Sequence, residues 1–172
     1  MSMDDTEPSV SKSEGRPRHD ADYYAWALDQ AARLRAVART GIDTGLDYEH
    51  LAEAMIGLAR AERDAVRDQL RRVIENLLRL EYSTASEPRQ LWELAVTDAR
   101  ATLADKMTAS LNEDAIDNLR QLYGQARRIA AADLAAHGEF NAAADLPKTC
   151  PYSLEQIIVQ GWLPKRRSTG DR

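Results

Sequence analysis

Apolar side chains recur at steps of three and four residues between positions 47 and 82, which is the period of an α-helix. Asp47 stands where an N-cap acceptor belongs, and Leu46 can pack on Leu51 across it. The pattern therefore predicts a single helix of about 50 Å, at a rise of about 1.5 Å per residue. One eight-residue gap in its apolar face is filled by Glu62. The expected buried residues are Leu51, Met55, Leu58, Val66, Leu70, Val73, Leu77 and Leu80.

Similar spacing, together with capping residues, predicts helices over residues 21–39, 88–110 and 112–138. A short fifth helix is expected over residues 153–161, and residues 140–147 are expected to form a loop. Because short connections make neighbouring helices antiparallel, the sequence predicts an all-α fold. Its architecture is an up-down-up-down four-helix bundle with one very long helix and a short C-terminal fifth helix. The long helix must overhang the others or kink, and Gly57 is the expected weak point.

Composition divides the chain into three parts. Residues 1–19 are polar with almost no apolar side chains, so we expect a disordered N-terminal tail. Residues 20–164 carry the helical pattern and form the predicted bundle domain. Residues 165–172 are expected to be a disordered basic C-terminal tail.

Charge and cysteine content narrow the range of partners and locations. The formal net charge is −5, which disfavours nucleic acid as the main partner of the whole molecule. The single cysteine, Cys150, excludes an internal disulfide framework and fits a reducing compartment. No signal-peptide pattern is present, and no apolar run approaches the roughly 20 residues that span a bilayer. We therefore expect a cytoplasmic protein with no membrane contact.

The sequence gives little support for a metal site or for a catalytic nucleophile. His50 opens the long helix and His137 closes the fourth, so in an up-down bundle they lie at opposite ends; His19 falls in the expected tail. We therefore expect no metal site, no catalytic residues and no cofactor. Cys150 has no histidine placed to activate it and is followed by Pro151, which favours a packing role.

A polar group at the core is the strongest candidate site. Glu62 falls on the apolar face of the long helix, and a buried acid needs a partner, for which Arg100 is well placed. With Glu53 and Arg60, this pair has two interpretations. It is either an ion pair that sets the packing of the helices or a polar groove that binds a ligand or a partner.

Trp162 is the fifth candidate binding residue. With Leu163 it follows the short C-terminal helix, and we expect the two side chains to dock on the bundle. A short helix held through one aromatic side chain can detach and expose an apolar groove, which would make a partner site.

A series of short motifs occurs in order between residues 23 and 164. These are Tyr23-x-x-Trp26, Gln30-Ala31-x-x-Leu34-Arg35, Leu51-Ala52-Glu53, Arg60-x-Glu62-Arg63, Leu77-Leu78 with Tyr82, Trp92, Arg100, Tyr123 with Ala126-Arg127, and Cys150-Pro151-Tyr152 through Leu163-Pro164. Their order and spacing resemble the bacterial family catalogued as domain of unknown function 29. The resemblance implies a helical bundle and no established activity.

The chain departs from the family pattern within the long helix. Where the family usually has further acidic residues, this sequence has Ala54 and Ile56. Near the end of that helix the family tends to have a histidine and a tryptophan, and the corresponding positions here are Asn76 and Leu80. A family site built on those acids or on that histidine would be incomplete in this chain.

Without a catalytic constellation, the sequence favours a small helical protein-interaction module that has no enzymatic activity. The overhang of the long helix would offer a surface to a protein partner or to a second copy. The alternative is an enzyme or ligand-binding bundle that uses the groove around Glu53, Arg60, Glu62 and Arg100. A second alternative is a nucleic-acid-associated accessory role, based on the arginines of the long helix and the basic C-terminus. Because Leu58 and Leu70 are expected core residues, Leu58→Asp or Leu70→Asp should unfold the protein.

Overall fold

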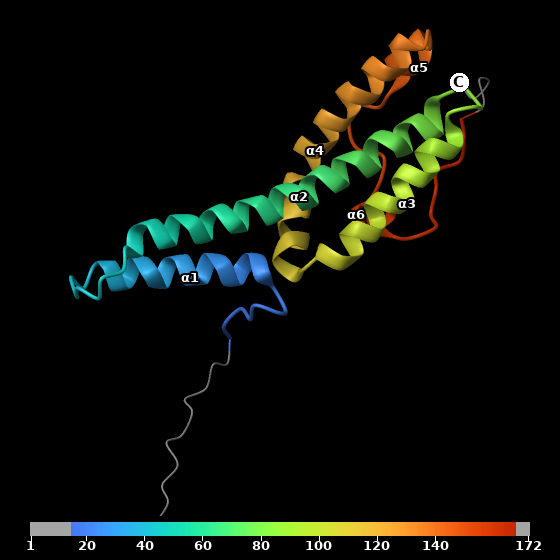
Figure 1. Cartoon of the computed structure of the whole chain (residues 1–172). Helices are drawn as coiled ribbons and strands as arrows, with labels where there is room; N and C mark the ends of the chain where they lie inside the picture. Colours follow the sequence, from blue (N-terminus) through green and yellow to red (C-terminus); the bar gives the residue numbers. More distant parts are fainter. Residues whose placement is uncertain (1–14, 168–172) are drawn as a thin grey trace, which may run out of the picture.

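The computed structural model describes residues 15–167 and consists of helices and connecting loops over that range (Figure 1). In chain order the helices are α1 (Tyr23–Ala38), α2 (Tyr48–Tyr82), α3 (Arg89–Lys106), α4 (Ala109–Ala136), α5 (Phe140–Asp145) and α6 (Leu154–Ile158). None of the helices in the described range is both long and apolar enough to cross a membrane. The predicted all-α class is confirmed.

Helix α2 is the element on which the other helices pack. It runs for 35 residues and continues without interruption through Gly57, so it overhangs its neighbours and does not break there. The predicted cap is present, because the Asp47 carboxylate accepts a hydrogen bond from the backbone N–H of His50 at 3.1 Å.

The helices are distributed along α2 differently from those of a four-helix bundle. Helix α1 lies antiparallel to the N-terminal half of α2, while α3, α4 and α6 pack around its C-terminal half (Figure 1). Within the described chain, the backbone of α1 does not come near that of α3, and the backbones of α3 and α4 both lie against α2 but not against each other. We call residues 22–62 the arm and residues 63–167 the body.

The two regions have different interiors. In the body, α2 buries Val66, Leu70, Val73, Ile74, Leu77, Leu78 and Leu80 in a cluster with side chains from α3, α4 and α6. In the arm, the fully buried residues are alanines: Ala27, Ala31, Ala52 and Ala59. The predicted core is therefore correct from Val66 onward. It is wrong for Leu51 and Leu58, which are 42% and 48% exposed because the arm has one layer of helix on one side only.

Two local boundaries also differ from prediction. Helix α3 ends at Lys106, and Thr108 caps α4 by accepting from the N–H of Leu111 at 3.4 Å, so α4 begins before the expected cap at Asn112. The expected loop over residues 140–147 contains α5, a short alanine-rich helix. Alanine has the highest helix propensity of all residues, which accounts for this turn of helix.

Residues at both ends of the described range contact the helices. The ring of His19 lies 4.7 Å from that of Trp26, and the guanidinium of Arg167 lies 4.7 Å from the centre of the Tyr82 ring. His19 and Arg167, which the prediction assigned to tails, therefore contact the helices, and the predicted domain bounds stay a prediction. The remaining tail residues, 1–14 and 168–172, lie outside the described range.

Candidate functional site

The residues of the predicted polar groove do not meet in the structure. Glu53 and Arg60 are exposed on the arm, whereas Arg100 lies inside the body. The Glu62 carboxylate accepts hydrogen bonds from Lys106 Nζ at 3.0 and 2.9 Å. The predicted Glu62–Arg100 pair is therefore wrong. Lys106 ends α3 level with Glu62, while Arg100 lies six residues earlier, which is about 9 Å along the helix axis.

Arg100 joins α3 to α6. It is 1% exposed, and its guanidinium donates to the carbonyl oxygens of Ile157 and Gln156 at 2.8 Å and of Trp162 at 2.7 Å. The first two carbonyls belong to the last turn of α6, where a cation is favoured by the helix dipole. Burial lowers the pKa of Arg100. The geometry indicates a structural role, and carbonyl partners of this kind leave no residue-type signal in a sequence.

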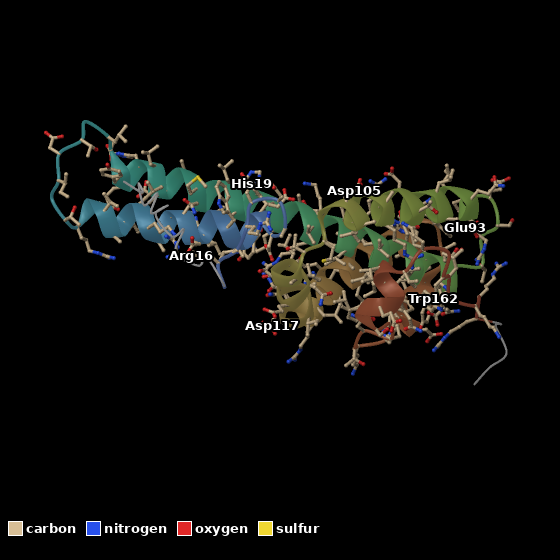
Figure 2. The ribbon with its side chains drawn as sticks, turned by 90° about the horizontal axis from the view of Figure 1, so that it is seen from below. Arg16, His19, Glu93, Asp105, Asp117 and Trp162 are labelled. Atoms are coloured by element: carbon tan, nitrogen blue, oxygen red, sulfur yellow. The ribbon has the colours of Figure 1, made fainter. Side chains whose placement is uncertain are left out.

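Trp162 docks on the body, as the sequence analysis expected. Its ring is half-buried and meets the ring of Tyr152 edge to face, with centres 5.8 Å apart. The Tyr152 hydroxyl in turn donates to Glu81 at 2.7 Å. Figure 2 shows Trp162 on the body, well away from the arm, where His19 lies. A role for Trp162 in binding a partner stays a prediction.

The Cys150 thiol is poorly placed for nucleophilic chemistry, and the histidines lie on the surface. The Cys150 thiol is half-buried, donates to the carbonyl of Tyr152 at 3.3 Å, and has a pKa raised by burial, which disfavours the nucleophilic thiolate. His50 pairs with Asp47 on the surface. Within residues 15–167, His, Cys, Asp and Glu side chains do not gather in a group of three or more that could hold a metal ion.

Asp22 links the arm to the body with one carboxylate. One oxygen accepts from the N–H of Ala25 in α1, and the other accepts from the N–H of Ser110 in α4, both at 3.0 Å. The side chain therefore caps the N-termini of two helices. Burial opposes its ionisation, but the hydrogen bonds from Ala25, Ser110 and Thr108 outweigh burial and lower the pKa of Asp22.

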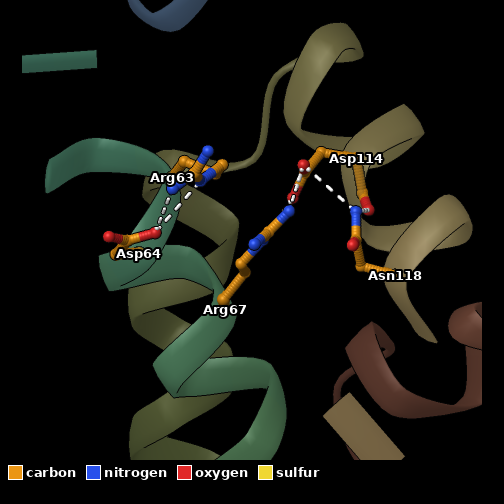
Figure 3. Close-up of polar contacts among 5 residues, drawn as sticks. All are labelled: Arg63, Asp64, Arg67, Asp114 and Asn118. Atoms are coloured by element: carbon orange, nitrogen blue, oxygen red, sulfur yellow. Dashed lines mark hydrogen bonds and ion pairs between the residues drawn. The ribbon is translucent and has the colours of Figure 1, made fainter. Parts of the chain in front are cut away.

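An ion pair at the same level joins α2 to α4. The guanidinium of Arg67 donates to both oxygens of Asp114, at 2.7 and 2.6 Å, and Asp114 also accepts from the side chain of Asn118 (Figure 3). These bonds raise the pKa of Arg67. One helical turn earlier, Arg63 pairs with Asp64. This network lies in the body beside the base of the arm, which Asp22 and the Glu62–Lys106 pair hold in place.

A polar cleft of about 350 Å³ lies beside this network, between α2 and α4. It is lined by Asp64, Arg67, Asp68, Asn118, Gln121, Leu122 and Gln125. The charged lining residues are already engaged with neighbours, since Arg67 pairs with Asp114, Asp64 with Arg63, and Asp68 with Arg71. Small-molecule sites are usually apolar with a few converging polar groups, so this cleft is the weaker candidate.

The stronger candidate is an apolar surface on the arm that α1 leaves exposed. Leu51 and Leu58 are exposed there, and Ala54 and Ala61, also exposed, lie between and beyond them. We call Leu51, Ala54, Leu58 and Ala61 of the arm, together with the half-buried Ala65 at the start of the body, the leucine–alanine strip. Steps of three, four, three and four residues are the heptad spacing of helices that pair with another helix. Sequence reasoning assigned the leucines to the core and missed the alanines.

Comparison with solved structures finds the same fold in an α-helical protein of unknown function from Rhodospirillum rubrum ATCC 11170. The two chains share 23% sequence identity with a TM-score of 0.72, and the match covers 85% of this chain and 92% of that one. At this identity the likeness shows the fold alone. Comparison with curated proteins finds no match.

The resemblance noted in the sequence is confirmed by comparison with protein families. The family described as Domain of unknown function DUF29 matches residues 19–163, which include both the arm and most of the body. The matched region begins at His19, next to α1, and ends just after Trp162. This chain therefore belongs to the DUF29 family.

Proposed function

We propose that this protein is a non-catalytic protein-interaction module and that the arm is its binding element. The observation that carries the proposal is the leucine–alanine strip, in which two leucines at heptad spacing are about half exposed on a projecting helix. A surface of this type is characteristic of a helix that packs against another helix.

The energetics of the arm support this proposal. Fully burying a leucine side chain contributes about 1.5–3 kcal/mol, whereas the only fully buried residues of the arm are four small alanines and its larger apolar side chains, such as Leu34 and Met55, are half-buried. Two helices with so little buried apolar surface are only marginally stable in water. A partner that covers Leu51 and Leu58 would therefore stabilise the arm as well as bind it.

The two alternative functions receive less support. An enzyme or ligand-binding site built from Glu53, Arg60, Glu62 and Arg100 would require residues that lie apart, two of them already engaged in structural contacts. For nucleic acid, three arginines of α2 are paired with carboxylates, so phosphates would have to displace Asp64, Asp114 and Asp68. We further propose a cytoplasmic location, which the lone Cys150 supports.

A photo-crosslinking residue placed at position 58 tests the proposal in cells of the source organism. The matched control carries the same residue at Leu94 on α3, which is 64% exposed and so more accessible to random collision. We expect a discrete protein adduct from position 58 that Ala54→Glu in the same chain abolishes. Equal labelling from positions 58 and 94, or no adduct from position 58, would contradict the proposal.

A further inference from the structure

We infer that the protein bound by the arm is a second copy of this chain, packed antiparallel about a two-fold axis that crosses α2 near residue 56. This inference rests on the proposed function and names its partner. It is drawn from the spacing of the leucine–alanine strip, its alternation of side-chain sizes and the distribution of charge along α2.

The strip is self-complementary in one antiparallel register. With a two-fold axis at residue 56, positions whose numbers sum to 112 lie opposite each other. Leu51 then faces Ala61 of the second copy, and Ala54 faces Leu58 of the second copy. Each leucine therefore faces an alanine, and the two-fold axis repeats both pairs. A two-fold interface requires one surface to be complementary to itself in this way.

Small residues also let the two backbones approach. Gly57 lies beside Leu58, and a Cβ built on Gly57 would have no atom within 4 Å, so the surface is open at the centre of the strip. Ala54 and Ala61 flank it at one helical turn on each side. The small side chains at the middle of the interface therefore allow the two helices to pack closely.

Charge along the helix favours the antiparallel orientation. Residues 43–53 contain four carboxylates and no lysine or arginine: Asp43, Asp47, Glu49 and Glu53. In the register above, residues 43–53 face residues 59–69 of the second copy, which contain three arginines and three carboxylates. Antiparallel packing therefore lays the acidic segment of each copy along a segment of balanced charge in the other. Parallel packing would bring like charges together, so the distribution selects one orientation.

A second copy also agrees with how the arm is held. The Asp22 and Glu62 contacts hold the base of the arm to the body, so the strip is presented in a defined position and its pairing costs little conformational freedom. The apolar side chains on α3, by comparison, form no such strip, because Leu91 and Leu94 are followed at the next turn by Asp98.

The first test measures the mass of the full chain by sedimentation over a wide range of concentrations. We expect the wild-type protein to shift from monomer to dimer as concentration rises. Leu51→Glu/Leu58→Glu should stay monomeric over the same range. The matched control Leu91→Glu/Leu94→Glu, which changes two exposed leucines on the body, should dimerise like the wild type. Circular dichroism confirms that each variant is folded.

The second test measures orientation by disulfide trapping in a Cys150→Ser background. In the proposed register, residue 51 faces residue 61 of the second copy, while the two copies of residue 51 lie about 15 Å apart, at about 1.5 Å per residue. That separation is too long for a disulfide. Mixing Leu51→Cys with Ala61→Cys chains should therefore give a cross-linked dimer, and Leu51→Cys alone should not.

The outcomes separate this inference from the proposed function. A chain that is monomeric at every concentration, or a dimer that survives Leu51→Glu/Leu58→Glu, overturns the second copy as the partner. If position 58 then cross-links in cells to a different protein, the interaction function stands and only this inference fails. If position 58 gives no adduct in cells either, both fail. Strong cross-linking of Leu51→Cys alone would overturn the antiparallel orientation.

Discussion

The two halves of α2 share one helical period but differ in what covers them. In the body, seven large aliphatic residues from Val66 to Leu80 are buried against three other helices. In the arm, α1 covers only Ala52 and Ala59 fully, and Leu51 and Leu58 remain exposed. An apolar face therefore identifies a helix surface that packs against another segment of protein. Whether that segment lies in the same chain depends on the other helices.

The polar contacts of the two regions differ in the same way. The body closes its own loops: the Glu139 carboxylate accepts from Ser83 Oγ at 2.9 Å and from the N–H groups of Thr84 and Ala85 at 3.1 and 3.0 Å. Arg100 similarly satisfies the end of α6. The main polar contacts of the arm with the body lie at its base. The body thus makes polar contacts between its own segments, whereas the arm contacts the body mainly at its base.

The largest expected effect comes from a charged residue placed in each half of α2. Leu70 is fully buried, so Leu70→Asp should lower the free energy of unfolding by more than about 4 kcal/mol and abolish cooperative melting. Leu58→Asp should change the unfolding free energy of the dilute monomer by only about 0.5 kcal/mol. Thermal melts followed by circular dichroism measure both, and similar losses would contradict the division into arm and body.

Arg100→Ala should have the next largest effect. It leaves three carbonyl oxygens in the body without their donor, and each buried unsatisfied group costs about 1–3 kcal/mol. We expect a loss of about 3 kcal/mol or more in the free energy of unfolding by urea, with a red shift of Trp162 fluorescence as α6 loosens, measured in a Trp26→Phe/Trp92→Phe background so that Trp162 alone emits. The control, Arg60→Ala on the arm, should leave stability and fluorescence unchanged. Unaltered Trp162 emission in Arg100→Ala would argue against the role assigned to Arg100.

Asp22→Ala should have a moderate effect at the junction of arm and body. Loss of an N-cap side chain costs about 0.5–2 kcal/mol, and here α1 loses its N-cap acceptor while α4 keeps Thr108 but loses the acceptor of the Ser110 N–H. Hydrogen exchange should increase in the first turns of α1 and α4, and Asp20→Ala serves as the control for an exposed neighbour. Faster exchange in α1 alone would show that Asp22 does not hold the arm to α4.

The pH dependence of this effect follows from the lowered pKa of Asp22. A carboxylate with a lower pKa in the folded state stabilises the protein fully above its unfolded pKa of about 3.9. That stabilisation is lost as the pH falls below this value and through the folded pKa. The difference in unfolding free energy between wild type and Asp22→Ala should therefore be constant near neutral pH and shrink in acid.

The smallest expected effects come from two helical glycines, one in each region. A Cβ built at Gly57 or at Gly124 meets no atom within 4 Å, so alanine should fit at both positions. Each change should stabilise its helix by about 1 kcal/mol. Gly124→Ala should raise the global melting temperature by about 2–4 °C. Gly57→Ala should instead slow hydrogen exchange in the arm, because an arm with an alanine interior opens before the body. Equal shifts in global melting would show that the two regions unfold together.

The candidate polar site shows the limit of prediction from single residues. Glu62 needed a partner and has one, but the partner is Lys106, because the level at which α3 crosses α2 decides which basic residue is within reach. Arg100 was expected to face a carboxylate and faces backbone carbonyls of α6. Because every residue has a backbone carbonyl acceptor, the residue types of α6 could not predict this contact.

The sequence by itself determined the described helices other than α5, the cap at Asp47, the core from Val66 to Leu80 and membership of the DUF29 family. These features depend on residues close together in the chain or on recurring motifs. The tertiary structure alone decided that α1 covers one side of the arm while α3 and α4 cover the far half of α2. Helical periodicity repeats identically along α2, so only the placement of the other helices determines which leucines are buried and which form the leucine–alanine strip.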